Sequence, residues 1–184
     1  MNLMVETLNS KIKKTLILGG ARSGKSRYGE QIVENCGKGI YLATALAPNL
    51  VKDVEMATRI AEHKKRRSRI WKTIEEPLDI AEVIRRESLE KLPILVDCLT
   101  LWLSNLMFEN LNLEKEIYDL VESLEKAVGP VICVSNEVGL GIVPENRLAR
   151  EFRDNAGLLN QEIAKVSKLV VLVTAGIPMI VKDE

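Results

Sequence analysis

The stretch TLILGGARSGKS, residues 15–26, decides the fold class of this chain. Its first four residues are continuously aliphatic, as in a strand that is buried on both faces. Its last eight residues fit the pattern GxxxxGK[ST], and a segment of helical composition, 25–36, follows directly. Because this pattern is meaningful between a strand and a helix, we read it as a phosphate-binding loop rather than a chance glycine turn. The chain is therefore expected to bind a nucleoside triphosphate.

The spacing of this loop has a chemical reason. Glycines let successive backbone N–H groups turn toward phosphate oxygens, and the following helix N-terminus adds positive partial charge. Lys25 is expected to reach the β- and γ-phosphates, and Ser26 is expected to bind Mg²⁺. The predicted nucleotide-binding residues are the whole loop: Gly19, Gly20, Ala21, Arg22, Ser23, Gly24, Lys25 and Ser26.

Strands and helices alternate along the rest of the chain. Further strand-like runs lie at 39–44, 93–98, 130–135 and 168–174, and helical segments lie at 53–65, 78–92, 99–110, 113–128 and 145–166. Continuous aliphatic strands indicate a sheet that helices cover on both faces, and such a sheet is parallel. In the last helix, which Pro144 precedes, one apolar face is predicted from Leu148, Phe152, Leu159, Ile163 and Val166.

These elements predict an α/β fold with a doubly wound, mostly parallel sheet. Residues 14–184 are expected to form a single nucleotide-binding catalytic domain. Residues 1–13 form a polar leader that we expect to be frayed.

Composition narrows the class of protein further. The 184 residues include 26 basic and 26 acidic side chains, so no global field favours nucleic acid as a partner. The three cysteines lie far apart without a CxxC pair, which predicts neither a disulfide framework nor a zinc ribbon. The longest apolar run, 169–181, is too short for a transmembrane segment and contains Gly176 and Pro178. We expect a cytoplasmic protein without a signal peptide.

Asp97 ends the aliphatic run 94–96. The carboxyl ends of parallel strands form the ligand-binding edge of an open α/β sheet, so this carboxylate is a candidate ligand of Mg²⁺ or of the nucleotide. Its alternative role is to cap the helix predicted at 99–110.

His63 is the only histidine of the chain. Its spacing from Met56 and Ile60 allows a place on the apolar face of a helix, yet a neutral imidazole is also a nucleophile toward phosphorus. Either a solvated helix face or a polyphosphate clamp would explain the basic residues around it. Those residues are Arg59, Lys64, Lys65, Arg66, Arg67, Arg69 and Lys72, with Glu62 the one acid among them.

The block after the strand at 130–135 leaves several roles open. Glu137 either acts on an acceptor hydroxyl or on Mg²⁺, or is an exposed turn residue. The helical spacing of Arg147, Arg150 and Asp154 suits either phosphate contacts or ion pairs. The two tryptophans, Trp71 and Trp102, are expected to pack rather than to bind ligand.

Six segments in order resemble a known family. They are GGARSGKS (19–26), YLATA (41–45), EMATRIAEHKKRR (55–67), DCLTLWLSNLM (97–107), SNEVGLGIVPENRLAREFRDNAGLLNQEIA (135–164) and VTAGIP (173–178). The chain is similar to the bifunctional adenosylcobinamide kinase / adenosylcobinamide-phosphate guanylyltransferases of cobalamin biosynthesis. The resemblance runs from Lys14 to Lys182, and the segment 136–161 is its most specific part.

The resemblance implies a P-loop fold of RecA-like type, a homotrimer and two activities. The first is phosphorylation of adenosylcobinamide by ATP or GTP. The second is transfer of GMP from GTP onto the product through a histidine–GMP intermediate, which releases pyrophosphate. The family nucleophile corresponds to His63. Beyond the phosphate loop, the family's nucleotide contacts correspond to Ala43, Thr44, Ala45, Lys64, Lys65, Arg66, Arg67, Glu75 and Asp97.

The sequence departs from the family at a few positions. Glu62 stands where some relatives carry a second histidine, and Ala45 and Ala175 replace serines of some members. Two alternatives are a P-loop kinase of another small metabolite and a RecA-like ATPase that acts on a partner. The first gives His63 and its basic neighbours no task, and the second predicts an interaction surface or tail that the sequence does not show.

Overall fold

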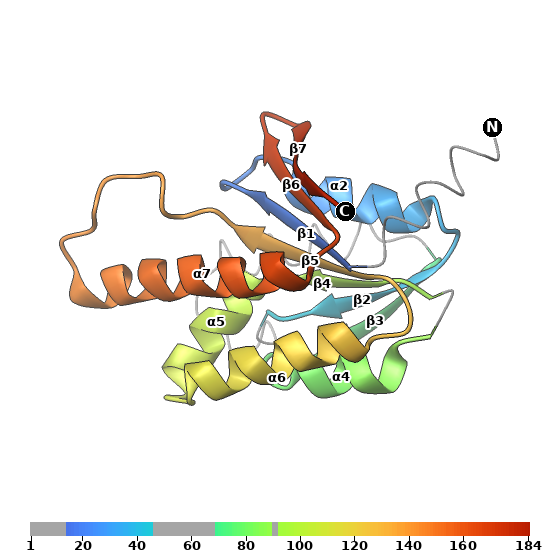
Figure 1. The fold of residues 1–184 in the computed structure, drawn as a ribbon, viewed down its shortest axis with the longest axis horizontal. Coiled ribbons are helices and arrows are strands. Elements are labelled where there is room, and N and C mark those ends of the chain that lie inside the picture. Colours follow the sequence, from blue (N-terminus) through green and yellow to red (C-terminus); the bar gives the residue numbers. More distant parts are fainter. Residues whose placement is uncertain (1–13, 46–68, 90–91) are drawn as a thin grey trace.

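The computed structural model describes residues 14–45, 69–89 and 92–184. Seven strands form one sheet in the order β3-β2-β4-β5-β1-β6-β7 (Figure 1). All neighbouring pairs are parallel except β6 and β7. The strands are β1 (Lys14–Gly19), β2 (Gly39–Ala43), β3 (Trp71–Glu75), β4 (Ile94–Asp97), β5 (Val131–Asn136), β6 (Leu169–Thr174) and β7 (Ile177–Asp183).

Helices cover both faces of this sheet, which confirms the predicted doubly wound α/β fold. Within the described residues, α2 covers one face and the other four helices cover the opposite one (Figure 1). The helices are α2 (Lys25–Glu34), α4 (Ile80–Glu87), α5 (Leu99–Phe108), α6 (Leu113–Lys126) and α7 (Arg147–Val166).

Alternating side chains of each central strand belong to two different cores. In β1, Leu16 packs with the four-helix side and Ile17 packs with the α2 side, and both are fully buried. Because each strand is buried on both faces, its sequence is continuously aliphatic. The carboxyl ends of β1, β2, β4 and β5 meet at one edge of the sheet, since these strands are parallel.

Two strands were absent from the sequence prediction. Within the described residues, β3 lies at one edge of the sheet and pairs with β2 alone, and β7 is the antiparallel strand at the other edge. Edge strands bury less apolar surface: three of the five residues of β3 are polar, and most residues of β7 are exposed.

Helix boundaries also differ from the prediction. α7 begins at Arg147 because the side chain of Asn146 accepts a hydrogen bond from the Ala149 N–H at 3.2 Å, so Pro144 lies in the loop before it. Leu148 is 63% exposed and does not extend the core face of α7, which was a wrong prediction. The predicted helix 53–65 and the leader 1–13 lie outside the described residues.

The hairpin turn between β6 and β7 lies against the phosphate loop. Ala175 and Gly176 have φ values of 52° and 79°, and Thr174 pairs with Ile177, which defines a two-residue hairpin. The Gly176 N–H donates to the Ser23 carbonyl at 2.8 Å.

Within the described residues, no helix is long and apolar enough to cross a bilayer.

Candidate phosphate-binding and metal site

The loop between β1 and α2 has the backbone geometry of a phosphate-binding loop. Arg22 and Gly24 have φ values of 56° and 97°, so the chain turns sharply before α2 begins at Lys25. Gly19 is required by close approach, because a Cβ atom there would lie 2.5 Å from both the Ser23 Oγ and the Val173 carbonyl oxygen. The Ser23 hydroxyl is buried and has no hydrogen-bond partner among the described residues. The loop therefore holds a buried polar atom that a bound oxyanion would satisfy.

Lys25 lies folded back over this loop. Its side chain is buried, and its Nζ donates to the Gly20 carbonyl at 3.0 Å. Desolvation lowers the pKa of the Lys25 ammonium below its usual value, and the neighbouring Cys98 and Asp97 oppose this shift. A phosphate group would give this ammonium a stronger partner than a neutral carbonyl, because charge-assisted hydrogen bonds are roughly twice as strong.

Asp97, the last residue of β4, accepts hydrogen bonds from both α2 and β2. Its Oδ1 accepts a hydrogen bond from the Ser26 hydroxyl at 3.2 Å, and its Oδ2 accepts one from the Tyr41 hydroxyl. α5 has Cys98 as its N-cap, so Asp97 does not fill the capping role left open by the sequence. The peptide bond between Asp97 and Cys98 is cis.

These residues fit a bound Mg²⁺. A hydroxyl oxygen and a carboxylate oxygen lie 3.2 Å apart at the helix N-terminus that follows the phosphate loop. Mg²⁺ prefers oxygen ligands and is commonly held by one or two protein groups together with substrate phosphates. Ser26 and Asp97 would therefore hold the ion, and the nucleotide would complete its coordination.

At the neighbouring end of β2, buried polar side chains form hydrogen bonds with main-chain groups. The Thr44 side chain is fully buried, and its hydroxyl donates to the Cys98 carbonyl at 2.7 Å and accepts from the Cys98 N–H at 2.9 Å. The Asn105 amide of α5 donates to the Thr44 carbonyl at 2.8 Å and to the Pro77 carbonyl at 3.0 Å. Asn105 thus joins the loop after β2 to the loop after β3.

The remaining predicted nucleotide contacts divide into two groups. Ala43 and Ala45 flank Thr44, and Glu75 lies exposed at the end of β3, whose last residue pairs with Ala43. The structure brings these residues to the same sheet edge as the phosphate loop. His63 and the basic run Lys64, Lys65, Arg66 and Arg67 lie outside the described residues.

The residues left open in the C-terminal block make local contacts. The Glu137 carboxylate accepts a hydrogen bond from the Gly139 N–H at 2.5 Å, and its own N–H donates to the Gly19 carbonyl at 3.1 Å. Arg147 forms an ion pair with Glu151 at 2.7 Å, which is the i,i+4 alternative. The other two side chains also bond locally: Arg150 donates to the Pro144 and Glu145 carbonyls, and Asp154 pairs with Arg153.

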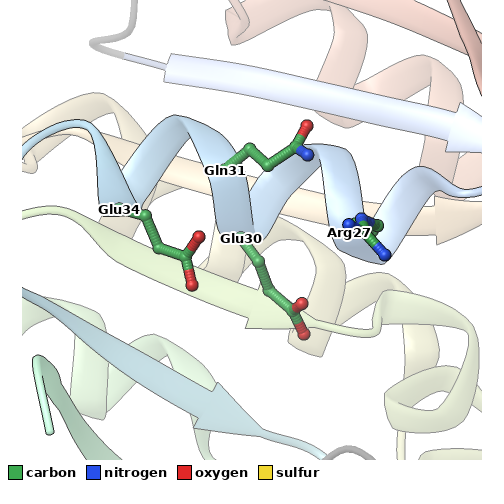
Figure 2. A pocket seen from close by; sticks show the side chains of 4 residues that line it. All are labelled: Arg27, Glu30, Gln31 and Glu34. Atoms are coloured by element: carbon green, nitrogen blue, oxygen red, sulfur yellow. The ribbon is translucent and has the colours of Figure 1, made fainter. Parts of the chain in front are cut away.

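A hollow of about 280 Å³ lies along α2 (Figure 2). Its lining side chains are Arg27, Glu30, Gln31 and Glu34, all from this one helix. Among the described residues no second element contributes a group, so this part of the chain does not give the hollow the converging polar groups found at the phosphate loop. Among residues 14–45, 69–89 and 92–184, no cluster of three His, Cys, Asp or Glu side chains could hold a metal by itself.

Sequence reasoning missed two residues of this edge. Tyr41 reaches Asp97 because it pairs with Leu95 on the neighbouring strand, and Asp97, two residues after Leu95, lies on the same face of the sheet. Asn105 could have been found from the sequence, because it is the one amide side chain in the apolar segment LTLWLSNLMF. A buried amide needs hydrogen-bond partners, so its position indicates bonds to other segments. Trp71 and Trp102 pack as expected: Trp71 lies edge-to-face against Tyr41, and the Trp102 indole donates to the Leu78 carbonyl at 2.7 Å.

Solved structures with a similar fold are distant in sequence. The flagellar accessory protein FlaH of Methanocaldococcus jannaschii superposes with a TM-score of 0.53 at 14% identity, covering 97% of this chain and 84% of that chain. A structure from Pyrococcus horikoshii OT3 gives a TM-score of 0.52 at 13% identity, covering 97% and 92%. At these identities the likeness shows the fold alone.

Sequence relatives are much closer. The bifunctional adenosylcobalamin biosynthesis protein CobP of Pseudomonas aeruginosa is 47% identical over 174 residues, covering 93% of this chain and 98% of the relative. The CobU proteins of Escherichia coli K12 and Salmonella typhimurium are 36% and 38% identical, each covering 91% of this chain and 98% of the relative. The sequence model of one family matches residues 15–181, which include every strand of the sheet in whole or in part. This chain belongs to the cobinamide kinase / cobinamide phosphate guanyltransferase family.

Proposed function

We propose that this chain first phosphorylates adenosylcobinamide with ATP or GTP and then transfers GMP from GTP to adenosylcobinamide phosphate. The products of the second step are adenosylcobinamide-GDP and pyrophosphate. The observation that carries the proposal is the phosphate loop with Lys25, Ser26 and Asp97 brought together, in a chain that the family matches over residues 15–181. We infer the acceptor substrate, adenosylcobinamide, from membership of the family.

In the phosphorylation step, the acceptor hydroxyl attacks the γ-phosphorus in line, loses its proton, and the nucleoside diphosphate leaves. The backbone N–H groups of the loop and the buried Lys25 ammonium stabilise the charge on the transferred phosphoryl group. Mg²⁺ bound at Ser26 and Asp97 would supply positive charge for the phosphate oxygens. The Tyr41 and Ser26 hydroxyls hold the Asp97 carboxylate at the loop before any ligand enters.

In the transfer step, we propose that His63 attacks the α-phosphorus of GTP and that pyrophosphate leaves. A phosphate oxygen of the acceptor then attacks the same phosphorus and releases His63. The basic run Lys64–Arg67 would balance the charge of the departing pyrophosphate. The Thr44 hydroxyl is already bonded to Cys98, so we propose that Thr44 contacts the bound nucleotide through its main chain.

The test is incubation with Mg²⁺ and GTP labelled at the α-phosphate, followed by denaturation and intact-mass measurement. We expect one GMP per chain, in an adduct that acid cleaves and base does not. The adduct should be missing in His63→Ala, while this variant keeps its kinase activity on adenosylcobinamide. Protein that binds GTP without forming an adduct would leave a P-loop kinase of another small metabolite as the better function.

We also propose that the protein is a cytoplasmic homotrimer, as in the family it resembles. Support comes from β7, an edge strand whose apolar side chains Ile177, Met179, Ile180 and Val181 are all more than half exposed. Light scattering after gel filtration should give three times the chain mass of 20.6 kDa. A monomer at micromolar concentration would contradict this assembly.

A further inference from the structure

We propose that Tyr41 is a positioning residue for the metal-binding carboxylate: its hydroxyl fixes Asp97 so that one oxygen faces Ser26 and the ion. This inference rests on the proposed function, because it concerns the Mg²⁺ used in phosphoryl transfer. Within the described residues, Tyr41 is the tyrosine whose hydroxyl donates to Asp97, and the family resemblance assigns it no role of its own.

The register of the sheet explains why the tyrosine reaches this carboxylate. Tyr41 pairs with Leu95 across β2 and β4, and Asp97 lies two residues beyond Leu95 on the same strand. All three side chains therefore lie on the face that α2 covers. α2 begins beside the phosphate loop, so Ser26 meets Asp97 from the helix while Tyr41 meets it from the neighbouring strand.

The Ser26 and Tyr41 hydroxyls bond to different oxygens of the Asp97 carboxylate. Ser26 bonds to Oδ1 at 3.2 Å, which is long for a bond between a hydroxyl and a carboxylate, whereas Tyr41 bonds to Oδ2. A cation entering at Ser26 would take Oδ1 or a water bound to it and leave the Tyr41 bond in place. Tyr41 thereby prevents rotation of the carboxylate, which is the usual task of a residue behind a metal ligand.

Tyr41 is itself held rigidly. Its side chain is 2% exposed, and its ring packs edge-to-face on Trp71 of β3 with centroids 5.6 Å apart. Removing only the hydroxyl leaves this packing intact, so Tyr41→Phe isolates the hydrogen bond from the fold. Tyr118 on α6 is 70% exposed and supplies a matched control for the same substitution.

The experiment measures Mn²⁺ binding by electron paramagnetic resonance, with the β,γ-imido analogue of ATP present at saturation. We expect Tyr41→Phe to weaken Mn²⁺ binding about 10-fold, a typical loss when a partner of a metal ligand is removed. Binding of the analogue without metal should stay within about twofold of wild type, and Tyr118→Phe should match wild type in both assays.

A double-mutant cycle with Asp97→Asn distinguishes positioning from a general effect. Once Asp97 is replaced, removing the Tyr41 hydroxyl should have no further effect on Mn²⁺ binding. Wild-type affinity for Mn²⁺ in Tyr41→Phe, or an equal loss in both backgrounds, would overturn the positioning role while leaving the proposed function standing. Wild-type protein that binds neither the analogue nor Mn²⁺ would overturn the proposed function and this role together.

Discussion

The ends of β1 and β4 and the ends of β2 and β3 lie at the same edge of the sheet, yet their polar side chains have different tasks. At β1 and β4, functional groups contact one another: Ser26 bonds to Asp97, and Lys25 bonds within its own loop. At β2 and β3, Thr44 and Asn105 bond to main-chain groups and hold the loops themselves. The first region, the side-chain region, holds the candidate functional groups on side chains, and the second, the frame region, holds its loops by bonds to the main chain.

The largest expected effect is on the side-chain region. Lys25→Ala should lower the rate of phosphoryl transfer about 10²–10³-fold, because it removes a buried positive charge from the transferred group. The rate is measured as labelled phosphate transferred from γ-labelled ATP to adenosylcobinamide. Lys38→Ala, which removes an exposed lysine after α2, should keep the wild-type rate. A Lys25→Ala rate within threefold of wild type would place the phosphoryl chemistry elsewhere.

In the frame region, the expected loss is one of stability. Asn105→Leu leaves the buried Thr44 carbonyl and the half-buried Pro77 carbonyl without their amide donor, so the free energy of unfolding should fall by about 2–3 kcal/mol. Urea unfolding measures this loss. Asn155→Leu removes an amide from a partly exposed position on α7 and should change stability by less than about 0.5 kcal/mol. Equal effects of both substitutions would refute the bridging role of Asn105.

Thr44 separates the two kinds of region most directly. Thr44→Val keeps the shape but removes both hydrogen bonds to Cys98, so we expect a loss of about 1–2 kcal/mol in the free energy of unfolding. Thr44→Ser keeps the hydroxyl and should bind GTP as tightly as wild type in a calorimetric titration. A loss of GTP affinity in Thr44→Ser with unchanged stability would show that the side chain, rather than the main chain, serves the nucleotide.

The smallest effect concerns the buried thiols beneath the two regions. Burial raises the pKa of Cys98 to about 11 and that of Cys133 to about 12. Between pH 9 and these values the unfolded chain loses the thiol protons first, so these thiols stabilise the fold below pH 9 and this contribution is lost as the pH rises. Urea unfolding at pH 7.5 and 10 should show this fall, and Cys133→Val should reduce its slope. An unchanged slope would mean that Cys133 ionises freely in the fold.

Local patterns predicted much of this structure. The strands β1, β2, β4, β5 and β6 were found because burial on both faces requires unbroken aliphatic sequence. β3 was missed because it is a short edge strand with more polar than apolar residues, and β7 because Gly176 lies just before it and Pro178 lies within it. Patterns along the chain detect burial well and edges poorly.

The site shows the same division. The strand–loop–helix at residues 15–26 was predicted because its signal lies in consecutive residues, and its binding of phosphate stays a prediction. The bonds from Tyr41 to Asp97 and from Asn105 to Thr44 join positions 56 and 61 residues apart, and their geometry depends on strand register and helix placement. Such pairs become visible only when the strand order is known.

That strand order also determines when the phosphate loop can work during synthesis. β1, which leads into the loop, lies between β5 and β6: Lys14 pairs with Val131, and Thr15 pairs with Leu169. A growing chain contains the loop early, but it lacks β5 until about residue 136 and β6 until about residue 174. We therefore expect nucleotide binding at this loop to follow the synthesis of β6 rather than that of the loop itself.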